Sequence, residues 1–153
     1  MKFALEPLHK IKDEVKDLIA HHWDDVALNK DYIKLNPDWD AYARLEKSQS
    51  LRIYTARENE VLVGYLVVLV NRSLHYKDHL FANNDVVFVH KDYRKGLSGA
   101  KLIKYAEKDL KDLGVSLFMI NTKVHKPFGK LLDFLGFSEI ETLYSKRLDG
   151  SNK

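Results

Sequence analysis

The chain has 153 residues, of which 45% are hydrophobic and 31% charged, and its formal net charge is +3. It contains no cysteine, which excludes disulfide bonds, thiolate metal ligands and a cysteine nucleophile. The charge is small and interleaved with acidic residues, so we do not expect a nucleic-acid partner. No apolar run approaches the roughly 20 residues of a membrane span, and the apolar run at the start is too short for a secretory signal. We therefore expect a cytoplasmic protein with no membrane partner.

The first third of the chain predicts a short strand and two helices. Residues 2–5 suit an opening strand, and apolar residues from Leu8 to Ile19 recur at spacings of three and four, which predicts a helix ending near residues 21–25. Asn36-Pro37-Asp38 is typical of a stop followed by a new helix start. With Asp38 as its N-cap, we expect a second helix that runs to about Ser48.

The middle of the chain predicts three strands. Residues 51–56 and 61–70 indicate two antiparallel strands joined by a tight turn around Asn59. The second of them is apolar at nearly every position, which favours a place in the middle of a sheet with both faces covered. A polar connection over residues 71–79 then leads to a strand that ends in the apolar run 86–89.

The last third predicts a helix over 97–113 with Gly114 as its C-cap, a strand over 116–122, and a short helix between Pro127 and Gly136. Residues 137–148 alternate apolar and polar side chains, which predicts a final edge strand. The order is β-α-α-β-β-β-α-β-α-β. It predicts one α/β domain over residues 1–153, built on a six-stranded, mixed, mostly antiparallel sheet with four helices on its two faces.

A basic turn that contains glycine joins the 86–89 strand to the helix after it. Glycine lets the backbone approach a ligand closely, and the free N–H groups of a first helical turn suit phosphate oxygens. Arg94, Lys95 and Lys101 add positive charge, so the turn is a candidate diphosphate site. The alternative is a connector whose basic residues are only solvated. The turn lacks the patterns of the mononucleotide and dinucleotide phosphate loops.

This turn resembles the pyrophosphate loop of the GNAT superfamily of acetyl-CoA-dependent N-acetyltransferases, which reads Arg or Gln, two residues, Gly, one residue, then Gly or Ala. Asp92-Tyr93-Arg94 resembles the usual approach, and Gly99 stands at the final small residue. Leu97 stands where the first glycine is expected, and Gly96 lies one position before it.

The resemblance extends over nearly the whole chain through the element order, Val-Gly-Tyr at residues 63–65 and Leu-Gly-Phe at residues 135–137. Pairs such as His22-Trp23 and His75-Tyr76 also resemble small GNAT-fold proteins encoded by tailed bacteriophages. That narrower likeness would place the protein in the cytoplasm of a bacterial host.

The family resemblance implies acetyl-CoA as co-substrate. In this superfamily the fourth strand splays from the fifth, and pantetheine enters the gap by bonding to main-chain groups of the fourth strand. A backbone N–H there would polarise the acetyl carbonyl. By resemblance the cofactor-binding residues are Val87, Phe88, Val89, Arg94, Lys95, Gly96, Ser98, Gly99, Ala100 and Asn121.

The resemblance also implies a base, because an alkylamine acceptor is protonated at neutral pH and must lose a proton before it attacks. Asp85 is the first candidate, since several GNAT enzymes carry a catalytic carboxylate at the start of the fourth strand, where burial would raise its pKa. Otherwise Asp85 only caps a turn. His22, His75 and Tyr76 are further candidates, in segments that border the acceptor pocket of this fold, or else are surface and packing residues.

Many family members supply a tyrosine from the last helix to protonate the leaving thiolate. Here that position is Leu132, so the proton must come from Tyr144, Tyr105, His125 or solvent. Without a cysteine, direct acetyl transfer in a ternary complex is favoured over an acyl-enzyme. The seven histidines show no ligand spacing, so we expect no metal.

The expected activity is therefore transfer of acetyl to a small amine or a protein amine. Asp24, Asp25 and the aromatic residues near the first two helices would suit a cationic acceptor or equally a packed core. An alternative function is a catalytically weak GNAT-fold module that binds a host or partner protein, favoured by Leu97 and Leu132. Binding of DNA through the basic surface ranks last. Pairing of two copies through the last strands would give a homodimer.

Overall fold

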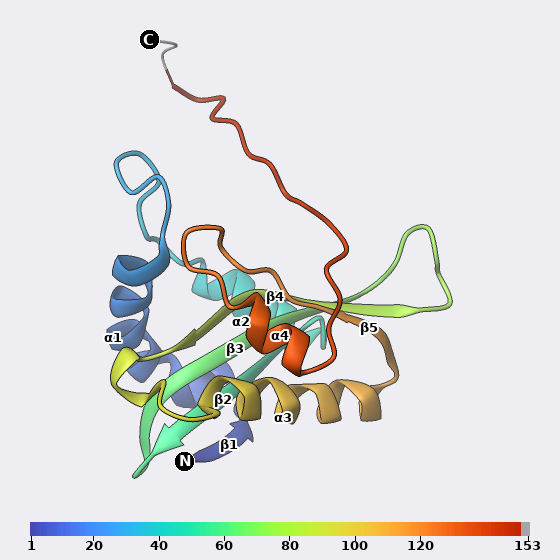
Figure 1. Cartoon of the computed structure of the whole chain (residues 1–153), viewed down its shortest axis with the longest axis horizontal. Coiled ribbons are helices and arrows are strands. Elements are labelled where there is room, and N and C mark those ends of the chain that lie inside the picture. The colour runs from blue at the N-terminus through green and yellow to red at the C-terminus, as the bar shows by residue number, and fades with distance from the viewer. Residues whose placement is uncertain (151–153) are drawn as a thin grey trace.

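The computed structural model describes residues 1–150, and within this range a five-stranded sheet carries helices on both faces (Figure 1). The strands are β1 (Lys2–Leu5), β2 (Leu51–Glu58), β3 (Val61–Arg72), β4 (Leu80–Val89) and β5 (Val115–Met119). They lie side by side in chain order. β1 to β4 pair antiparallel and β5 pairs parallel to β4, so the sheet is mixed, as predicted.

The helices are α1 (Leu8–Val26), α2 (Trp39–Lys47), α3 (Ser98–Leu113) and α4 (Gly129–Phe134), with a 3₁₀ turn η1 at Lys91–Tyr93. The predicted helix starts and stops are largely confirmed. Asp38 Oδ1 accepts a hydrogen bond from the Ala41 N–H at the start of α2, as an N-cap does. Gly114 ends α3 with a φ of 92°, a left-handed conformation that glycine adopts without strain.

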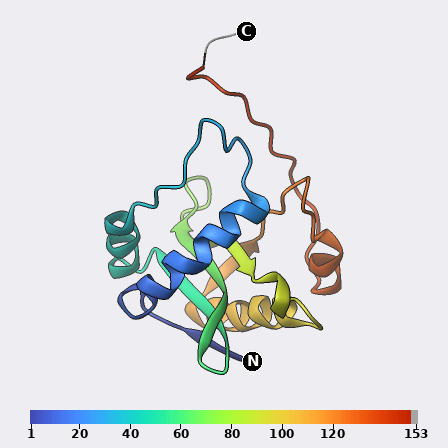
Figure 2. The same ribbon diagram turned by 90° about the vertical axis from the view of Figure 1, so that its left-hand side faces the viewer.

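The sheet separates two hydrophobic cores, one on each of its faces. On one face α1 and α2 cover β2, β3 and the Phe88 side chain, with Ile11 fully buried. On the other face α3 and α4 pack against β3, β4 and β5 through residues such as Leu102 and Leu132. Figure 2 shows α1 crossing the near face while α3 lies behind the sheet. The prediction that β3 lies inside the sheet with both faces covered is confirmed, because its residues 62–68 are all buried.

The prediction of a sixth strand over residues 137–148 is wrong. Within residues 1–150 the sheet has five strands, and the segment after Gly136 carries no helix or strand. The alternating pattern describes a chain that could cover a sheet with one face, but a strand also needs a neighbour that bonds its backbone. In this copy of the chain no strand provides that neighbour for residues 138–148.

Candidate active site

The two edges of β4 are paired over different lengths. β5 pairs only with residues Leu80 to Asn83 of β4, whereas β3 pairs with β4 along its whole length. Opposite Val67 and Val68 the register shifts, so that Asp85 is an extra residue without a partner on β3. Such a β-bulge bends a strand and redirects its side chains. The second half of β4 therefore has one bonded side and one open side.

Asn84 lies at the point where β4 and β5 separate. Its side chain is buried, and its Oδ1 accepts a hydrogen bond of 2.7 Å from the Asn121 backbone N–H. At this point, where β4 and the chain after β5 diverge, a side-chain hydrogen bond takes the place of the backbone–backbone hydrogen bond of a regular sheet. Asn121, which the sequence analysis assigned to the cofactor, is thus adjacent to the opening, with its own N–H used inside the protein.

The open side of β4 presents main-chain groups of Val87 and Val89. The His90 N–H donates to the Val63 carbonyl on β3 at 2.8 Å, and successive residues of a strand point their backbone groups in opposite directions. The Val89 carbonyl accordingly faces away from β3, where it accepts a hydrogen bond from Arg94 Nε at 2.7 Å. The Phe88 side chain points instead into the core under α1.

The basic loop after β4 leads into the start of α3. Gly96 has a φ of 68°, while Leu97 has a φ of −106°, which any residue adopts. The left-handed position of the loop is thus supplied by the displaced glycine, and a leucine fits where the family pattern has glycine. The first helical hydrogen bond runs from the Lys101 N–H to the Leu97 carbonyl. The N–H groups of Ser98, Gly99 and Ala100 precede it, so the helix itself gives them no acceptor.

Arg94 joins this loop to the end of α1. Its guanidinium lies 5.3 Å from the centre of the Phe88 ring and bonds the Asp25 carboxylate at 2.5 Å. Lys126 approaches the same carboxylate at 3.4 Å. The hydrogen bond from Arg94 lowers the pKa of the Asp25 carboxyl. Asp25 is therefore engaged with two cations of the protein rather than free for a cationic acceptor.

His22, one of the predicted catalytic residues, lies beneath the open half of β4. Its ring stacks on Phe88 with the centroids 4.8 Å apart, and its Nδ1 lies 2.6 Å from the Tyr65 hydroxyl oxygen. Burial lowers the pKa of His22 to about 4, so the imidazole is neutral at pH 7. Its packing against Phe88 supports the wall of the opening.

Asp85 is exposed, so the burial expected from the sequence is absent. Its Oδ2 accepts a hydrogen bond of 2.6 Å from the Tyr42 hydroxyl of α2. Burial, reinforced by the Asp85 carboxylate, raises the pKa of the Tyr42 hydroxyl, which therefore stays protonated and donates. A carboxylate at the bulge, held by a donor from α2, can accept a proton from an amine.

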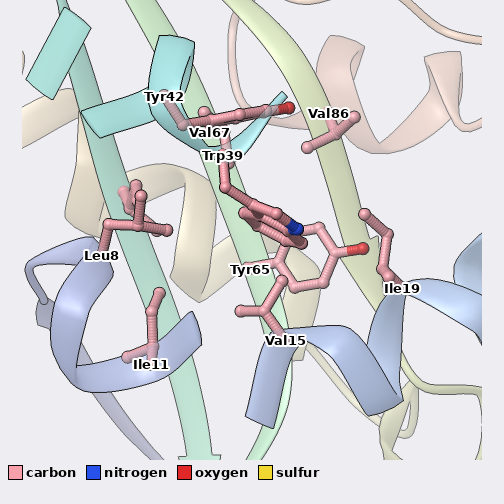
Figure 3. Close-up of a pocket in the computed structure, with 10 residues that line it drawn as sticks. Leu8, Ile11, Val15, Ile19, Trp39, Tyr42, Tyr65, Val67 and Val86 are labelled. Atoms are coloured by element: carbon pink, nitrogen blue, oxygen red, sulfur yellow. The ribbon is translucent and has the colours of Figure 1, made fainter. Parts of the chain in front are cut away.

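A narrow apolar pocket on the α1 and α2 side is lined in part by Tyr42, which bonds Asp85, and by Val86, which follows Asp85 in β4. Figure 3 shows the Trp39 ring over the Tyr65 ring, with Val86 and Ile19 beside the two tyrosine hydroxyls. Its volume is about 20 Å³, room for about one water molecule. Trp39, one of the aromatic residues that suited either substrate contact or packing, therefore packs in this pocket, whereas Tyr42 both lines the pocket and donates a hydrogen bond from its hydroxyl to Asp85.

His75 and Tyr76 are not brought together with Asp85 and His22. They lie in the hairpin between β3 and β4, beyond the paired half of β4 and at the opposite end of that strand from the basic loop (Figure 1). The Tyr76 ring packs near Phe81, and His79 holds the hairpin to Ser116 at the start of β5. The placement does not support a role for His75 or Tyr76 at the opening.

The residues considered as proton donors for a thiolate are also dispersed. Leu132, which stands at the position of the usual tyrosine, is buried in the core between α4 and the sheet. Tyr105 packs against Tyr54 on the α3 side, and Tyr144 is exposed. His125 Nε2 lies 3.0 Å from the Val26 carbonyl at the end of α1. Of these, His125 lies nearest to the residues that surround Arg94.

The residues that sequence reasoning missed are Asn84 and Tyr42 in their bonding roles. The three polar residues in succession, Asn83, Asn84 and Asp85, within an otherwise apolar strand are a usable signal for the role of Asn84. The Tyr42 bond joins residues 43 positions apart, for which the sequence holds no periodic signal.

No group of three or more His, Asp or Glu side chains within residues 1–150 is arranged to hold a metal ion. None of the helices in this range combines the length and the apolar character needed to cross a membrane.

Residues 14–134 match the family model described as the acetyltransferase (GNAT) family. No curated protein sequence matches the chain significantly. Among solved structures, a ribosomal-protein-alanine N-acetyltransferase from Brucella melitensis biovar Abortus 2308 is similar at a TM-score of 0.73 and 19% identity, covering 97% of this chain and 100% of that one.

Two further structures resemble the chain. A transcriptional regulator from Bacillus halodurans C-125 has a TM-score of 0.75 and 20% identity, with coverage of 96% and 99%. An aminoglycoside acetyltransferase from an uncultured soil metagenomic sample, in complex with trehalose, has a TM-score of 0.73 and 15% identity, with coverage of 97% and 96%. At these identities the likeness concerns the fold.

Proposed function

Because this chain belongs to the acetyltransferase (GNAT) family, we propose that it transfers the acetyl group of acetyl-CoA to a primary amine. The single observation that carries the proposal is the half-open β4, which has a free main-chain edge and leads directly into a basic loop at a helix start. An extended pantetheine arm can bond such an edge as a strand would. A pyrophosphate suits the loop and the first N–H groups of α3.

The residues present fit acetyl-CoA by their chemistry. Val87 and Val89 offer backbone groups on the open side, and Ser98, Gly99 and Ala100 offer N–H groups without helical acceptors. Arg94 and Lys95 supply the positive charge that a diphosphate requires, and Gly96 turns the backbone toward it. A Cβ on Gly99 would make only an ordinary contact of 3.5 Å with Leu131, so packing alone does not require glycine there.

Arg94 has to exchange partners for this purpose. In the structure its Nε bonds the Val89 carbonyl and its Nη2 bonds Asp25. A bound diphosphate competes with Asp25 for the guanidinium, and Lys126 remains to neutralise the Asp25 carboxylate. The exchange replaces one charge-assisted bond by another, so it has a small net cost.

In the proposed reaction Asp85 takes a proton from the ammonium form of the acceptor, whose pKa in an alkylamine is about 10.4. The neutral nitrogen attacks the acetyl carbonyl, a C–N bond forms, and the C–S bond to CoA breaks. The second amine proton leaves to solvent, and the thiolate takes a proton from solvent, since Leu132 places no hydroxyl there. Acetyl passes directly to the amine in a ternary complex.

The acceptor approaches from the side of Tyr42 and Asp85, because Lys126 still neutralises the Asp25 carboxylate after Arg94 has moved to the diphosphate. The exposed Asp85 carboxylate suits a small amine or a protein amine that reaches it from solvent, since the apolar pocket under Tyr42 has room for only about one water molecule. The acceptor class therefore stays within primary amines, and a panel of polyamines, lysine peptides and short alkylamines covers it.

Steady-state release of the CoA thiol against that panel tests the proposal. We expect turnover with at least one amine, and a loss of about 100-fold in kcat for Asp85→Asn, the usual size of a general-base contribution. Asp78→Asn in the β3–β4 hairpin is the matched control, also an exposed carboxylate, and should stay within about twofold of wild type. Equal rates for wild type and Asp85→Asn would remove Asp85 from the chemistry.

The second candidate function, a binding module with little catalysis, is favoured by one specific observation. The position from which the family usually supplies a tyrosine is a buried leucine, Leu132. Under this alternative the protein binds acetyl-CoA, but no amine of the panel causes release of the CoA thiol. Restoring a hydroxyl by Leu132→Tyr should then raise thiol release, with Leu132→Phe as the control for size.

A further inference from the structure

The Asp25 carboxylate at the end of α1 connects the two parts of the chain that border the opening beside β4. Arg94, in the basic loop after β4, bonds it at 2.5 Å, and Lys126, in the segment after β5, approaches it at 3.4 Å. One acidic side chain is therefore held by cations from both sides of the opening. We call these three residues, Arg94, Asp25 and Lys126, the Asp25 bridge.

A second contact fixes the segment after β5 to α1. His125 Nε2 lies 3.0 Å from the carbonyl oxygen of Val26, the residue next to Asp25, and Figure 2 shows this segment beside the end of α1. Together with Lys126, this contact docks the segment onto α1, whereas the loop after β4 is held to α1 by Arg94. The two sides of the opening can therefore part at the Arg94–Asp25 bond while the segment after β5 stays on α1.

Arg94 also occupies the open edge of β4. Its Nε donates a hydrogen bond of 2.7 Å to the Val89 carbonyl, and its guanidinium lies 5.3 Å from the centre of the Phe88 ring. The Val89 carbonyl is one of the main-chain groups that an extended thioester arm would bond. Val89 stands between the Asp85 bulge and the start of α3 in the chain. The Asp25 bridge thus lies across the route from the reacting end of the opening to the basic loop.

The bridge competes with a ligand for the same donor. In the structure the Asp25 carboxylate takes the place at the Arg94 guanidinium that an oxygen of a diphosphate would take. A ligand that binds only the open form has an apparent dissociation constant that is larger than the intrinsic one by the inverse of the open fraction. Loss of the Asp25 charge should therefore tighten binding, which is the opposite of the result for a residue that holds the cofactor.

We infer that the Asp25 bridge closes the cofactor opening in the free protein, and that acetyl-CoA binds once Arg94 has left Asp25. The inference rests on the proposed function, because it concerns the same opening. The diphosphate then takes the Arg94 guanidinium, while Asp25 stays with Lys126 on the side of α1. A thioester without a diphosphate must open the bridge as well but gains no bond from Arg94, so it binds poorly.

Asp25→Asn tests the closure, because the amide keeps the size of the side chain but lacks the charge that holds Arg94. The two side chains are partly exposed, 43% for Arg94 and 27% for Asp25, so their ion pair contributes as a strong surface pair does. We expect Asp25→Asn to bind acetyl-CoA about fivefold more tightly than wild type in calorimetric titration. Asp17→Asn, an exposed carboxylate earlier on α1, is the matched control and should bind as wild type does.

Acetyl-pantetheine separates closure of the opening from simple repulsion between Asp25 and phosphate. It carries the thioester arm but no phosphate and no charge, so a change in repulsion does not alter its affinity. Closure predicts that Asp25→Asn tightens its binding by the same factor as for acetyl-CoA, because the same bridge must open for both ligands. Its affinity is measured by competition with acetyl-CoA in the same titration, and circular dichroism checks that all three proteins are folded.

A similar gain for both ligands in Asp25→Asn, without a gain in Asp17→Asn, supports the inference. Equal or weaker binding of acetyl-CoA by folded Asp25→Asn overturns the inference and leaves the proposed function intact. A gain for acetyl-CoA alone also overturns it, because Asp25 then acts by repulsion, and so does an equal gain in Asp17→Asn, which indicates a general effect of charge. If neither wild type nor Asp25→Asn binds acetyl-CoA, the proposed function fails together with the inference.

Discussion

The two halves of β4 differ in one respect that accounts for the site. Residues Leu80 to Asn83 are bonded on both sides, by β3 and by β5, and end in a hairpin of exposed side chains. Residues 84–89 are bonded by β3 alone and end in the basic loop before α3. The first half is closed to a ligand, and the second half has a free edge. Position along the strand therefore decides which polar residues can take part in chemistry.

The largest effect that we expect concerns His22, which supports the open half through Phe88. Its pKa is about 4 in the folded protein, against about 6.5 in an unfolded chain. As the pH falls below 6.5, the unfolded state binds a proton that the folded state does not, so stability is full above that pH and declines toward pH 4. The shift corresponds to about 3 kcal/mol in the free energy of unfolding.

Denaturant unfolding between pH 7.5 and pH 4 checks this dependence. His22→Gln, which keeps an amide near the Tyr65 hydroxyl but does not titrate, should flatten the pH profile by most of that amount. His9→Gln, an exposed histidine on the same helix, is the matched control and should leave the profile unchanged. A profile that is the same in wild type and His22→Gln would show that His22 titrates normally.

The second effect concerns the point where the halves meet. Asn84→Ala removes the acceptor of the Asn121 N–H and should lower the free energy of unfolding by about 2 kcal/mol, as for other buried hydrogen bonds that lose one partner. It should also weaken acetyl-CoA binding, because the branch between β4 and β5 is no longer fixed. Asn83→Ala, in the half that is bonded on both sides, serves for comparison in the same unfolding measurement. Equal losses from the two substitutions would deny Asn84 its particular role.

A smaller effect is expected from Tyr42→Phe, which removes the hydroxyl that holds Asp85. The bond is exposed, so its loss should cost about 1 kcal/mol, or roughly a fivefold fall in kcat for acetyl transfer. Tyr32→Phe, in the connection before α2, is the matched control. If kcat for Tyr42→Phe equals that of wild type, the hydrogen bond from Tyr42 does not contribute to the action of Asp85.

The smallest effect is expected in the hairpin. His75→Ala and Tyr76→Phe change residues at the closed end of β4 and should leave kcat and KM within about twofold of wild type. A loss of tenfold or more in kcat/KM from either substitution would show that the hairpin takes part in the reaction and would contradict the distinction between the two halves of β4.

The elements of the fold could be predicted from the sequence because periodicity and capping residues are local signals. The spacing of Leu8, Ile11 and Val15 predicts α1, and Asp38 and Gly114 mark helix ends that the structure confirms. The sixth strand was wrong because alternation describes a side-chain pattern, and backbone pairing depends on where the neighbouring strand lies.

The site was less predictable because it depends on pairings between distant residues. The Arg94–Asp25 and Asn84–Asn121 bonds join residues 69 and 37 positions apart. The bulge at Asp85 appears only when β3 and β4 are placed in register. The sequence groups His75 and Tyr76 with Asp85 because all three lie near the start of the same strand. An extended strand separates its two ends, however, and the hairpin lies at the end that is remote from the basic loop.

Calorimetric titration of the purified protein with acetyl-CoA tests the central claim that the open half of β4 and the loop after it form the cofactor site. Wild type should bind saturably, and Arg94→Glu should lose at least tenfold in affinity, since it places a negative charge at the diphosphate. Lys108→Glu, the same charge change on the exposed face of α3, should bind as wild type does. Absence of binding by the folded wild-type protein, or equal affinity in Arg94→Glu, would contradict the assignment.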